Sequence, residues 1–160
     1  MNNFSFLSFI VLFLTLNVFG EENYELEVFV DNLDHPWSLV ELSSGDLLLT
    51  ELSGKLKLIS IDGLTIKEIR NVPDVLFRGQ GGLSDITLHP DFDNNGWIYF
   101  SYSAFVDDKK ELNTLFVDRA KIKGSELVSI QNIFQAQAYR KAPAHFGAKL
   151  FFLKDGSLMI

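Results

Sequence analysis

Short runs of alternating apolar and polar residues make up most of the chain after residue 20, and turns rich in glycine, serine or aspartate separate them. None of these runs keeps the three- and four-residue apolar spacing of an amphipathic helix. Alternation of this kind is typical of half-buried strands, so the sequence predicts an all-β protein. The first four runs predict one antiparallel sheet connected as a meander, and they lie at residues 37–42, 47–52, 55–61 and 64–69.

The same succession of runs and turns repeats further along the chain. A second set of four runs lies within residues 81–135, and a third set opens at residue 145. The corresponding turns at Gly45, Gly96 and Gly156 are about 50 to 60 residues apart. Four-stranded meanders at a regular period are typical of β-propeller blades, each of which buries its faces against its neighbours.

Two blades and the start of a third do not close a ring, because the outer faces of such an array need neighbouring sheets. The sequence therefore predicts that residues 21–160 are the N-terminal part of a single β-propeller domain that continues beyond Ile160. A β-sandwich of about nine strands is the competing fold. The repeated strand order and the matching turn positions favour the propeller.

Residues 1–20 contain no charged side chain and include the apolar run FSFLSFIVLFLTLNVFG. This run is short for a membrane span, and Gly20 fits the small-residue cleavage pattern of a secretory signal peptide. We therefore predict cleavage after Gly20, a periplasmic or secreted mature protein, and no stable membrane span after cleavage. An uncleaved N-terminal anchor is the alternative, and the mass of the mature protein distinguishes the two.

The composition supports a folded domain and argues against several function classes. With 47% hydrophobic and 13% aromatic residues, the chain has the apolar content that a packed core needs. Its formal net charge of −7 argues against nucleic-acid binding, which requires clustered Lys and Arg. The sequence has no cysteine, which excludes disulfide bonds, thiolate catalysis and Cys-ligated zinc.

The segment FRGQGGLSD at residues 77–85 is the first candidate binding element. It lacks the Lys-Ser/Thr pair of a phosphate-binding P-loop and the helix that should follow, so a nucleotide site is disfavoured. Its glycines fit a tight crossover between blades that needs positive φ angles. In the functional alternative, the same backbone brings the Gln80 amide close to a ligand.

The segment DFDNNG at residues 91–96 matches the first half of a calcium-binding EF-hand loop. The match fails at the twelfth position of such a loop, where a bidentate glutamate is required and Tyr102 stands instead. We therefore interpret the segment as a solvated β-turn whose Asp and Asn side chains bond their own backbone. No metal ligand is predicted from the residues alone.

Three histidines are candidates for chemistry. His35 and His89 each precede a proline, which favours extended backbone geometry, and both are interpreted as structural. His145 differs, because Ala144, Phe146 and Gly147 give it a compact neighbourhood without charges, in which a neutral imidazole can act as a base. The residues alone leave two interpretations of His145 open, a general base or a hydrogen-bonded histidine at the start of a strand.

Several motifs occur in a recognisable order and spacing: HPWSL, GDLLLTE, GQGGL, LHPDFDNNGWIYFSYS and HFGAKLFFLKDGSL. In this combination the chain resembles, from about Leu33 to its end, the soluble quinoprotein sugar dehydrogenases. These form the glucose/sorbosone dehydrogenase family, which includes the aldose sugar dehydrogenases. The resemblance implies a six-bladed propeller.

The resemblance also implies an activity and a cofactor. It indicates a periplasmic or secreted enzyme that holds pyrroloquinoline quinone (PQQ) with calcium, oxidises the anomeric carbon of aldose sugars and passes electrons to an external acceptor. The histidine of HFGAKL would be the general base, which is His145, and the glutamine of GQGGL would contact quinone or sugar, which is Gln80. Most of the cationic contacts and calcium ligands are expected beyond Ile160.

This chain departs from the family pattern at three positions. Ala144 replaces a polar residue before the histidine, Lys149 replaces a frequent arginine, and Leu52 replaces the arginine of the usual TER. Lysine keeps the positive charge but lacks the planar donor fork of arginine. The alternative function is therefore a non-catalytic propeller that binds a glycan or a protein partner, because a propeller fold does not by itself imply catalysis.

Overall fold

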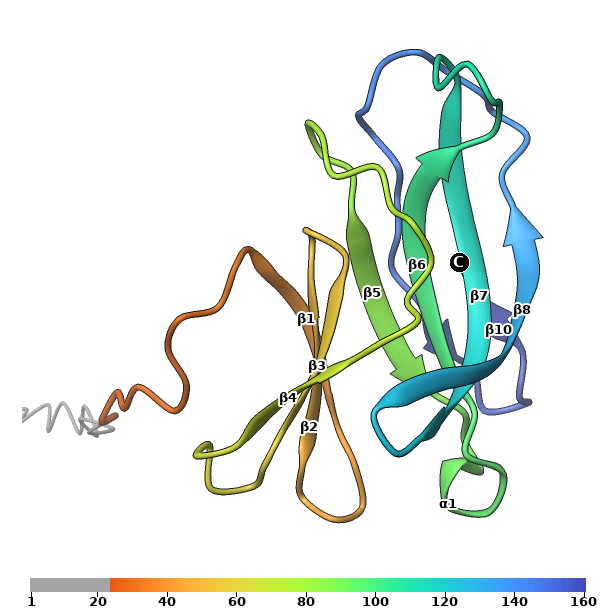
Figure 1. Cartoon of the computed structure of the whole chain (residues 1–160). Coiled ribbons are helices and arrows are strands. Elements are labelled where there is room, and N and C mark those ends of the chain that lie inside the picture. The colour runs from red at the N-terminus through yellow and green to blue at the C-terminus, as the bar shows by residue number, and fades with distance from the viewer. Residues whose placement is uncertain (1–23) are drawn as a thin grey trace, which may run out of the picture.

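The computed structural model describes residues 24–160, so the predicted signal peptide at residues 1–20 lies outside the described residues. Figure 1 shows two four-stranded antiparallel sheets followed by a short hairpin. The all-β prediction is confirmed. Within residues 24–160, no helix has the length and apolar character needed to cross a membrane.

Each large sheet is a meander whose strands follow the order of the sequence. The first sheet consists of β1 (Pro36–Glu41), β2 (Leu47–Glu51), β3 (Lys55–Ile59) and β4 (Ile66–Ile69). The second sheet consists of β5 (Leu83–Leu88), β6 (Ile98–Phe105), β7 (Asn113–Lys123) and β8 (Glu126–Gln135). The remaining elements are α1 (Phe92–Asn95), β9 (Phe151–Phe152) and β10 (Leu158–Met159).

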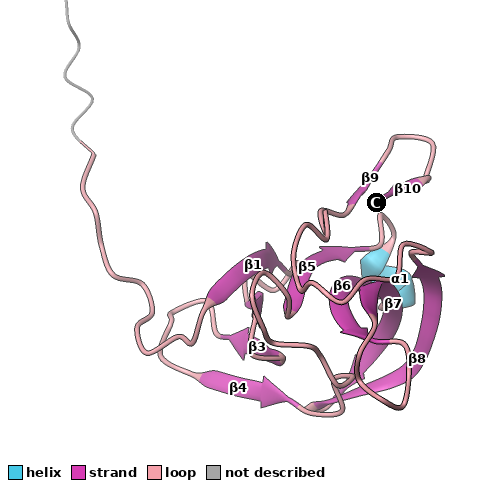
Figure 2. Cartoon of the chain, turned by 90° about the horizontal axis from the view of Figure 1, so that it is seen from above, coloured by secondary structure: helices cyan, strands magenta, loops and turns pink. Residues whose placement is uncertain are grey.

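The two sheets pack against each other through a shared apolar core. Viewed from above in Figure 2, β1 and β5 lie next to each other, and β6, β7 and β8 lie successively further from β1. On β6, the alternate residues Ile98, Phe100 and Tyr102 point into this core, as expected from the two-residue period of a strand. The buried members of the core are Leu48, Leu56, Ile69, Leu83, Ile86, Ile98, Phe100, Tyr102, Ala120 and Leu127.

Polar contacts also join the sheets at a distance from this core. At the end of β4, the Arg70 guanidinium pairs with the Glu126 carboxylate at 2.6 Å, and the Arg70 backbone N–H donates to the Ser125 carbonyl at 2.9 Å. Near α1, the Ser43 hydroxyl donates to the Asp93 carboxylate at 2.5 Å. Contacts of this kind tie consecutive sheets to each other, as the propeller interpretation requires.

The segment predicted as a β-turn at residues 91–96 is a single helical turn, which corrects that prediction. Gly96 closes the turn in the left-handed conformation, with φ +67°, and its N–H donates to the Phe92 carbonyl at 2.7 Å. A glycine adopts this conformation at little cost and commonly ends a helix. The Asn95 side chain accepts a hydrogen bond from the Trp97 N–H at 2.9 Å, so local side-chain bonding is present as predicted.

The strand predicted at residues 145–153 is also shorter than expected, because only Phe151 and Phe152 pair with β10. The residue before them, Leu150, donates its backbone N–H to the Asp85 carboxylate at 2.6 Å in place of a neighbouring strand. The hairpin nevertheless packs on the second sheet, where Phe152 and Leu158 cover Tyr99 and buried Leu150. A third meander therefore begins where the repeat predicts it.

Candidate active site

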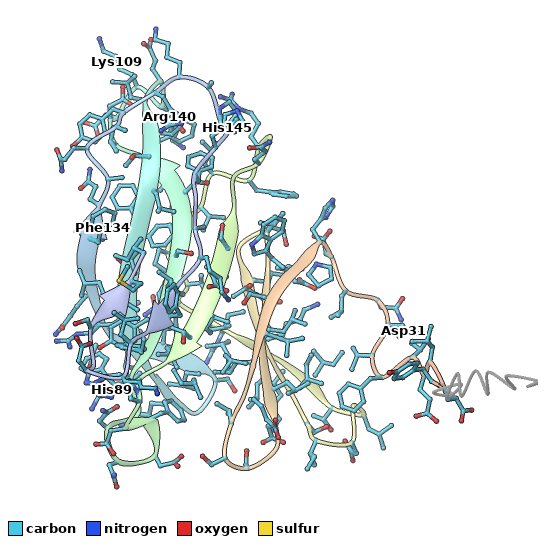
Figure 3. The ribbon with its side chains drawn as sticks, turned by 180° about the vertical axis from the view of Figure 1, so that it is seen from behind. Asp31, His89, Lys109, Phe134, Arg140 and His145 are labelled. Atoms are coloured by element: carbon cyan, nitrogen blue, oxygen red, sulfur yellow. The ribbon has the colours of Figure 1, made fainter. Side chains whose placement is uncertain are left out.

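Two loops meet at one end of the sheets, and both predicted site residues lie on them. The first loop contains Gln80 and leads into β5, and the second contains His145 and leads toward β9. Figure 3 shows His145 beside Arg140 at this end, while His89 lies at the opposite end of the same sheets. We call this end, formed by residues 77–82 and 140–147, the rim.

Gln80 and His145 are joined directly, although they are 65 positions apart in the sequence. The His145 backbone N–H donates to the Gln80 side-chain oxygen at 2.8 Å. In the reverse direction, the Gln80 backbone N–H donates to the Pro143 carbonyl at 2.9 Å. The structure therefore brings together the two residues that sequence reasoning singled out, and it leaves the Gln80 amide NH₂ without a bond to residues 24–160.

Close backbone approach explains the glycines around Gln80. Gly79 has φ +62°, and a Cβ at that position would lie 2.5 Å from the Pro143 carbonyl oxygen. Gly82 has φ +145°, and a Cβ there would lie 2.2 Å from the Leu52 carbonyl oxygen. Only glycine fits both the angles and the space. The motif is thus a tight crossover between two sheets, as one of the two sequence interpretations predicted.

His145 has an unusual backbone conformation that other residues hold in place. Its φ angle is +59°, in the left-handed region that residues with a side chain rarely adopt and that often marks functional sites. The Arg140 guanidinium donates to the Ala144 carbonyl at 3.1 Å and to the His145 carbonyl at 3.4 Å. Since Gln80 also accepts the His145 N–H, both the N–H and the carbonyl of His145 are bonded.

The imidazole of His145 is exposed, and within residues 24–160 its ring nitrogens bond to no other side chain or backbone group. The backbone of His145 is bonded and its ring is left accessible to whatever occupies the rim.

The other two histidines are placed differently. The His89 ring accepts the Asp91 N–H at 3.0 Å and packs against Tyr99 and Phe152, so its structural interpretation agrees with the contacts. His35 contacts the Asp34 carboxylate at 2.6 Å, and this hydrogen bond holds the pKa of Asp34 below its usual value.

The extended geometry predicted for His35 is wrong, since its φ angle is +54°. Its carbonyl accepts the Leu52 N–H at 3.0 Å, and its ring meets the edge of Phe77 at a centroid distance of 5.2 Å. These contacts, together with the Asp34 pairing, outweigh the local preference of a residue before proline.

Sequence reasoning missed one buried group near the rim, Asp85 on β5. Its side chain is almost fully buried and bonds to Ser38, Lys149 and the backbone of Leu150. Asp85 also lines an open pocket of about 370 Å³ together with Trp37, Ser38, Ala148 and Lys149. A single carboxylate inside the otherwise uncharged strand LSDITL was the available signal.

The residues at the rim fit one side of a site for an anionic quinone. Arg78 is exposed next to Gln80 and forms no ion pair with any described residue, so its positive charge is available to a carboxylate. The Gln80 NH₂ adds hydrogen-bond donors. In contrast, nowhere in residues 24–160 do three His, Asp or Glu side chains come together as metal ligands.

The chain is similar to known sugar dehydrogenases. The family model for glucose/sorbosone dehydrogenase matches residues 33–160. Aldose sugar dehydrogenase YliI from Escherichia coli is 34% identical over 136 residues, which cover 84% of this chain and 37% of that protein.

Solved structures of such enzymes share the fold. The apo-form of the soluble aldose sugar dehydrogenase from Escherichia coli has a TM-score of 0.72 at 33% identity, covering 79% of this chain and 37% of that one. The PQQ-bound aldose sugar dehydrogenase from Streptomyces coelicolor has a TM-score of 0.67 at 26% identity, and the match covers 83% of this chain and 39% of that one.

The chain thus spans well under half the length of these relatives. Its two sheets are consecutive blades of a β-propeller, and its final hairpin opens a third. The β-sandwich alternative is therefore wrong. The match over residues 33–160 establishes that this chain belongs to the glucose/sorbosone dehydrogenase family.

Proposed function

We propose that this protein is an exported, PQQ-dependent aldose sugar dehydrogenase in which His145 is the general base. The observation that carries the proposal is the exposed imidazole of His145, held by its own backbone at a rim where two blades meet. Membership of a family of sugar dehydrogenases supplies the reaction type. The signal-like residues 1–20 support export.

The division of labour follows from the chemistry. Oxidation of the anomeric C–OH of an aldose to C=O removes one hydride and one proton. PQQ, when bound, would supply the acceptor for the hydride and its two electrons. A ring nitrogen of His145 takes the hydroxyl proton, because imidazole is the side chain best suited to proton exchange near neutral pH. The fixed backbone holds the point from which this ring extends in one place at the rim.

Other residues of the rim orient and bind. Gln80 positions His145 through its side-chain oxygen, and its free NH₂ donates to the cofactor or the sugar. Arg78 pairs with a carboxylate of the cofactor. No step is assigned to calcium, and an external electron acceptor completes the turnover.

The test is a dye-reduction assay on the complete gene product, including any sequence encoded beyond Ile160, loaded with PQQ and calcium. The critical variant is His145→Asn, because asparagine tolerates the left-handed backbone that His145 adopts and lacks the base. We expect kcat to fall by about 10² or more while KM changes little, as is typical when a general base is removed.

Two outcomes would contradict the proposal. If wild-type protein with bound PQQ reduces no dye with any aldose, the proposed dehydrogenase activity is refuted. Sugar binding without turnover would favour the non-catalytic alternative. A His145→Asn variant with the wild-type rate would remove His145 from the mechanism.

A further inference from the structure

The carboxylate of Asp85 lies where three segments of the chain meet. Asp85 is on β5, the first strand of the second blade, and only 3% of its surface is exposed. Ser38 on β1 donates its hydroxyl to Oδ1 of Asp85 at 2.5 Å. From the third blade, the Leu150 N–H donates to Oδ2 at 2.6 Å, and the Lys149 ammonium lies 3.1 Å from the same oxygen. One side chain therefore links the innermost segments of three blades.

A neighbouring hydroxyl reinforces this link. The Asp85 backbone N–H donates to Ser101 Oγ at 3.0 Å, and that hydroxyl donates to the Ala148 carbonyl at 2.6 Å. The Leu150 side chain is 1% exposed and packs beside Tyr99. Residues 148–150 are thus anchored to the second blade by three polar contacts and one apolar contact.

This anchor lies directly downstream of the proposed base. Gln80 bonds to the His145 N–H, and Arg140 bonds to the carbonyl of the residue before it. Only two residues, Phe146 and Gly147, connect His145 to Ala148. Because the connection is only two residues long, we expect a shift of residues 148–150 to alter the contacts that hold His145.

The two kinds of contact to Asp85 differ in strength. The Lys149 side chain is 76% exposed, so solvent weakens its ion pair with Asp85. The Leu150 N–H is buried and has no other acceptor, and a buried donor without a partner is costly. The hydrogen bond to Leu150, more than the ion pair, fixes the segment.

We propose that Asp85 is a positioning residue that holds the His145 segment in its productive place through Leu150. The proposal rests on the proposed function, since it assigns Asp85 a role in orienting that same base. It does not make Asp85 a group that touches sugar or cofactor.

The test compares Asp85→Ala, which removes both oxygens that could accept the Leu150 N–H, with the matched control Asp118→Ala. Asp118 is also 3% exposed, lies on the same blade and accepts hydrogen bonds from Tyr102 and Asn132, but it makes no contact with residues 140–150. Two quantities are measured on the complete gene product: hydrogen exchange of the His145 amide, and kcat and KM of the PQQ-loaded protein. A melting curve for each variant shows that both are folded.

With Asp85→Ala we expect His145 exchange to rise about fivefold or more and kcat to fall about tenfold, while KM stays within about twofold. With Asp118→Ala we expect a similar loss of melting temperature and no change in either quantity beyond about twofold. Ser101→Ala, which removes the contact to Ala148, should act in the direction of Asp85→Ala.

The outcomes separate the two proposals. Equal His145 exchange in Asp85→Ala and Asp118→Ala would overturn the role of Asp85, whether or not the protein oxidises sugar. An effect of Asp85→Ala on exchange in a protein without aldose turnover would sustain the positioning of the segment and refute the proposed function.

Discussion

The peptide of His145 shows how a single residue can be held rigidly while its side chain stays free. Its N–H bonds to Gln80, its carbonyl bonds to Arg140, and its φ angle of +59° persists because those contacts define it. A left-handed backbone costs about 1 to 3 kcal/mol at residues with a side chain. The contacts around His145 must offset that cost.

The Gln80 contact gives a prediction at this scale. Gln80→Ala removes the acceptor of the His145 N–H, and a hydrogen bond of this kind is worth about 1 kcal/mol. We therefore expect exchange of the His145 amide to rise about fivefold in Gln80→Ala. Gln80→Glu is the control, because a carboxylate oxygen can still accept the bond. Unchanged exchange in Gln80→Ala would show that Gln80 does not hold the loop.

At the scale of elements, the second sheet contains a buried polar network within its own strands. Tyr102 on β6 donates its hydroxyl to the Asp118 carboxylate on β7 at 3.0 Å, and Asn132 on β8 donates to the other oxygen of Asp118 at 2.8 Å. Three consecutive strands are therefore joined by side chains as well as by the backbone ladder.

Tyr102→Phe leaves one buried carboxylate oxygen without its donor, which should lower the free energy of unfolding by about 1 to 3 kcal/mol in a urea titration. No loss of stability in this variant would contradict the network's contribution.

The same network predicts a dependence on alkaline pH. Burial, and next the negative charge of Asp118, raise the pKa of Tyr102 above its ordinary value. The folded state keeps the Tyr102 proton, whereas the unfolded state releases it near pH 10. The stabilisation that the protonated Tyr102 hydroxyl provides is therefore present below about pH 10 and is lost as the pH rises further. Wild-type protein should lose stability above pH 10 more steeply than Tyr102→Phe in urea titrations at increasing pH. Parallel curves for the two proteins would contradict this assignment.

Elements also show which features a sequence can predict. The eight long strands and their turns followed from local alternation and glycine positions, because both signals act between near neighbours. The helical turn at Phe92–Asn95 and the positive φ of His35 did not, because contacts beyond the local pattern decide them. Gln80 and His145 were identified through a family resemblance, but their hydrogen bond was not. Asp85 escaped notice because its partners lie 47 and 65 positions away.

At the scale of the whole molecule, the first strand of each blade and the segment before β9 lie side by side, joined by Asp85 (Figure 2). The loops that lead into β5 and β9 consequently meet at the same rim. Successive blades contribute Gln80 and His145 to one place, although the sequence separates them widely. The number of blades in the complete ring and the oxidation of an aldose stay predictions.

The central claim is that PQQ binds at the rim beside His145, and NMR of the histidine rings tests it most directly. His89 provides an internal control, because it lies at the opposite end of the sheets (Figure 3). On addition of PQQ and calcium to the complete gene product, the account predicts that the ring signals of His145 shift while those of His89 stay unchanged. A shift of the His89 signals with those of His145 unmoved, at saturating PQQ, would contradict it.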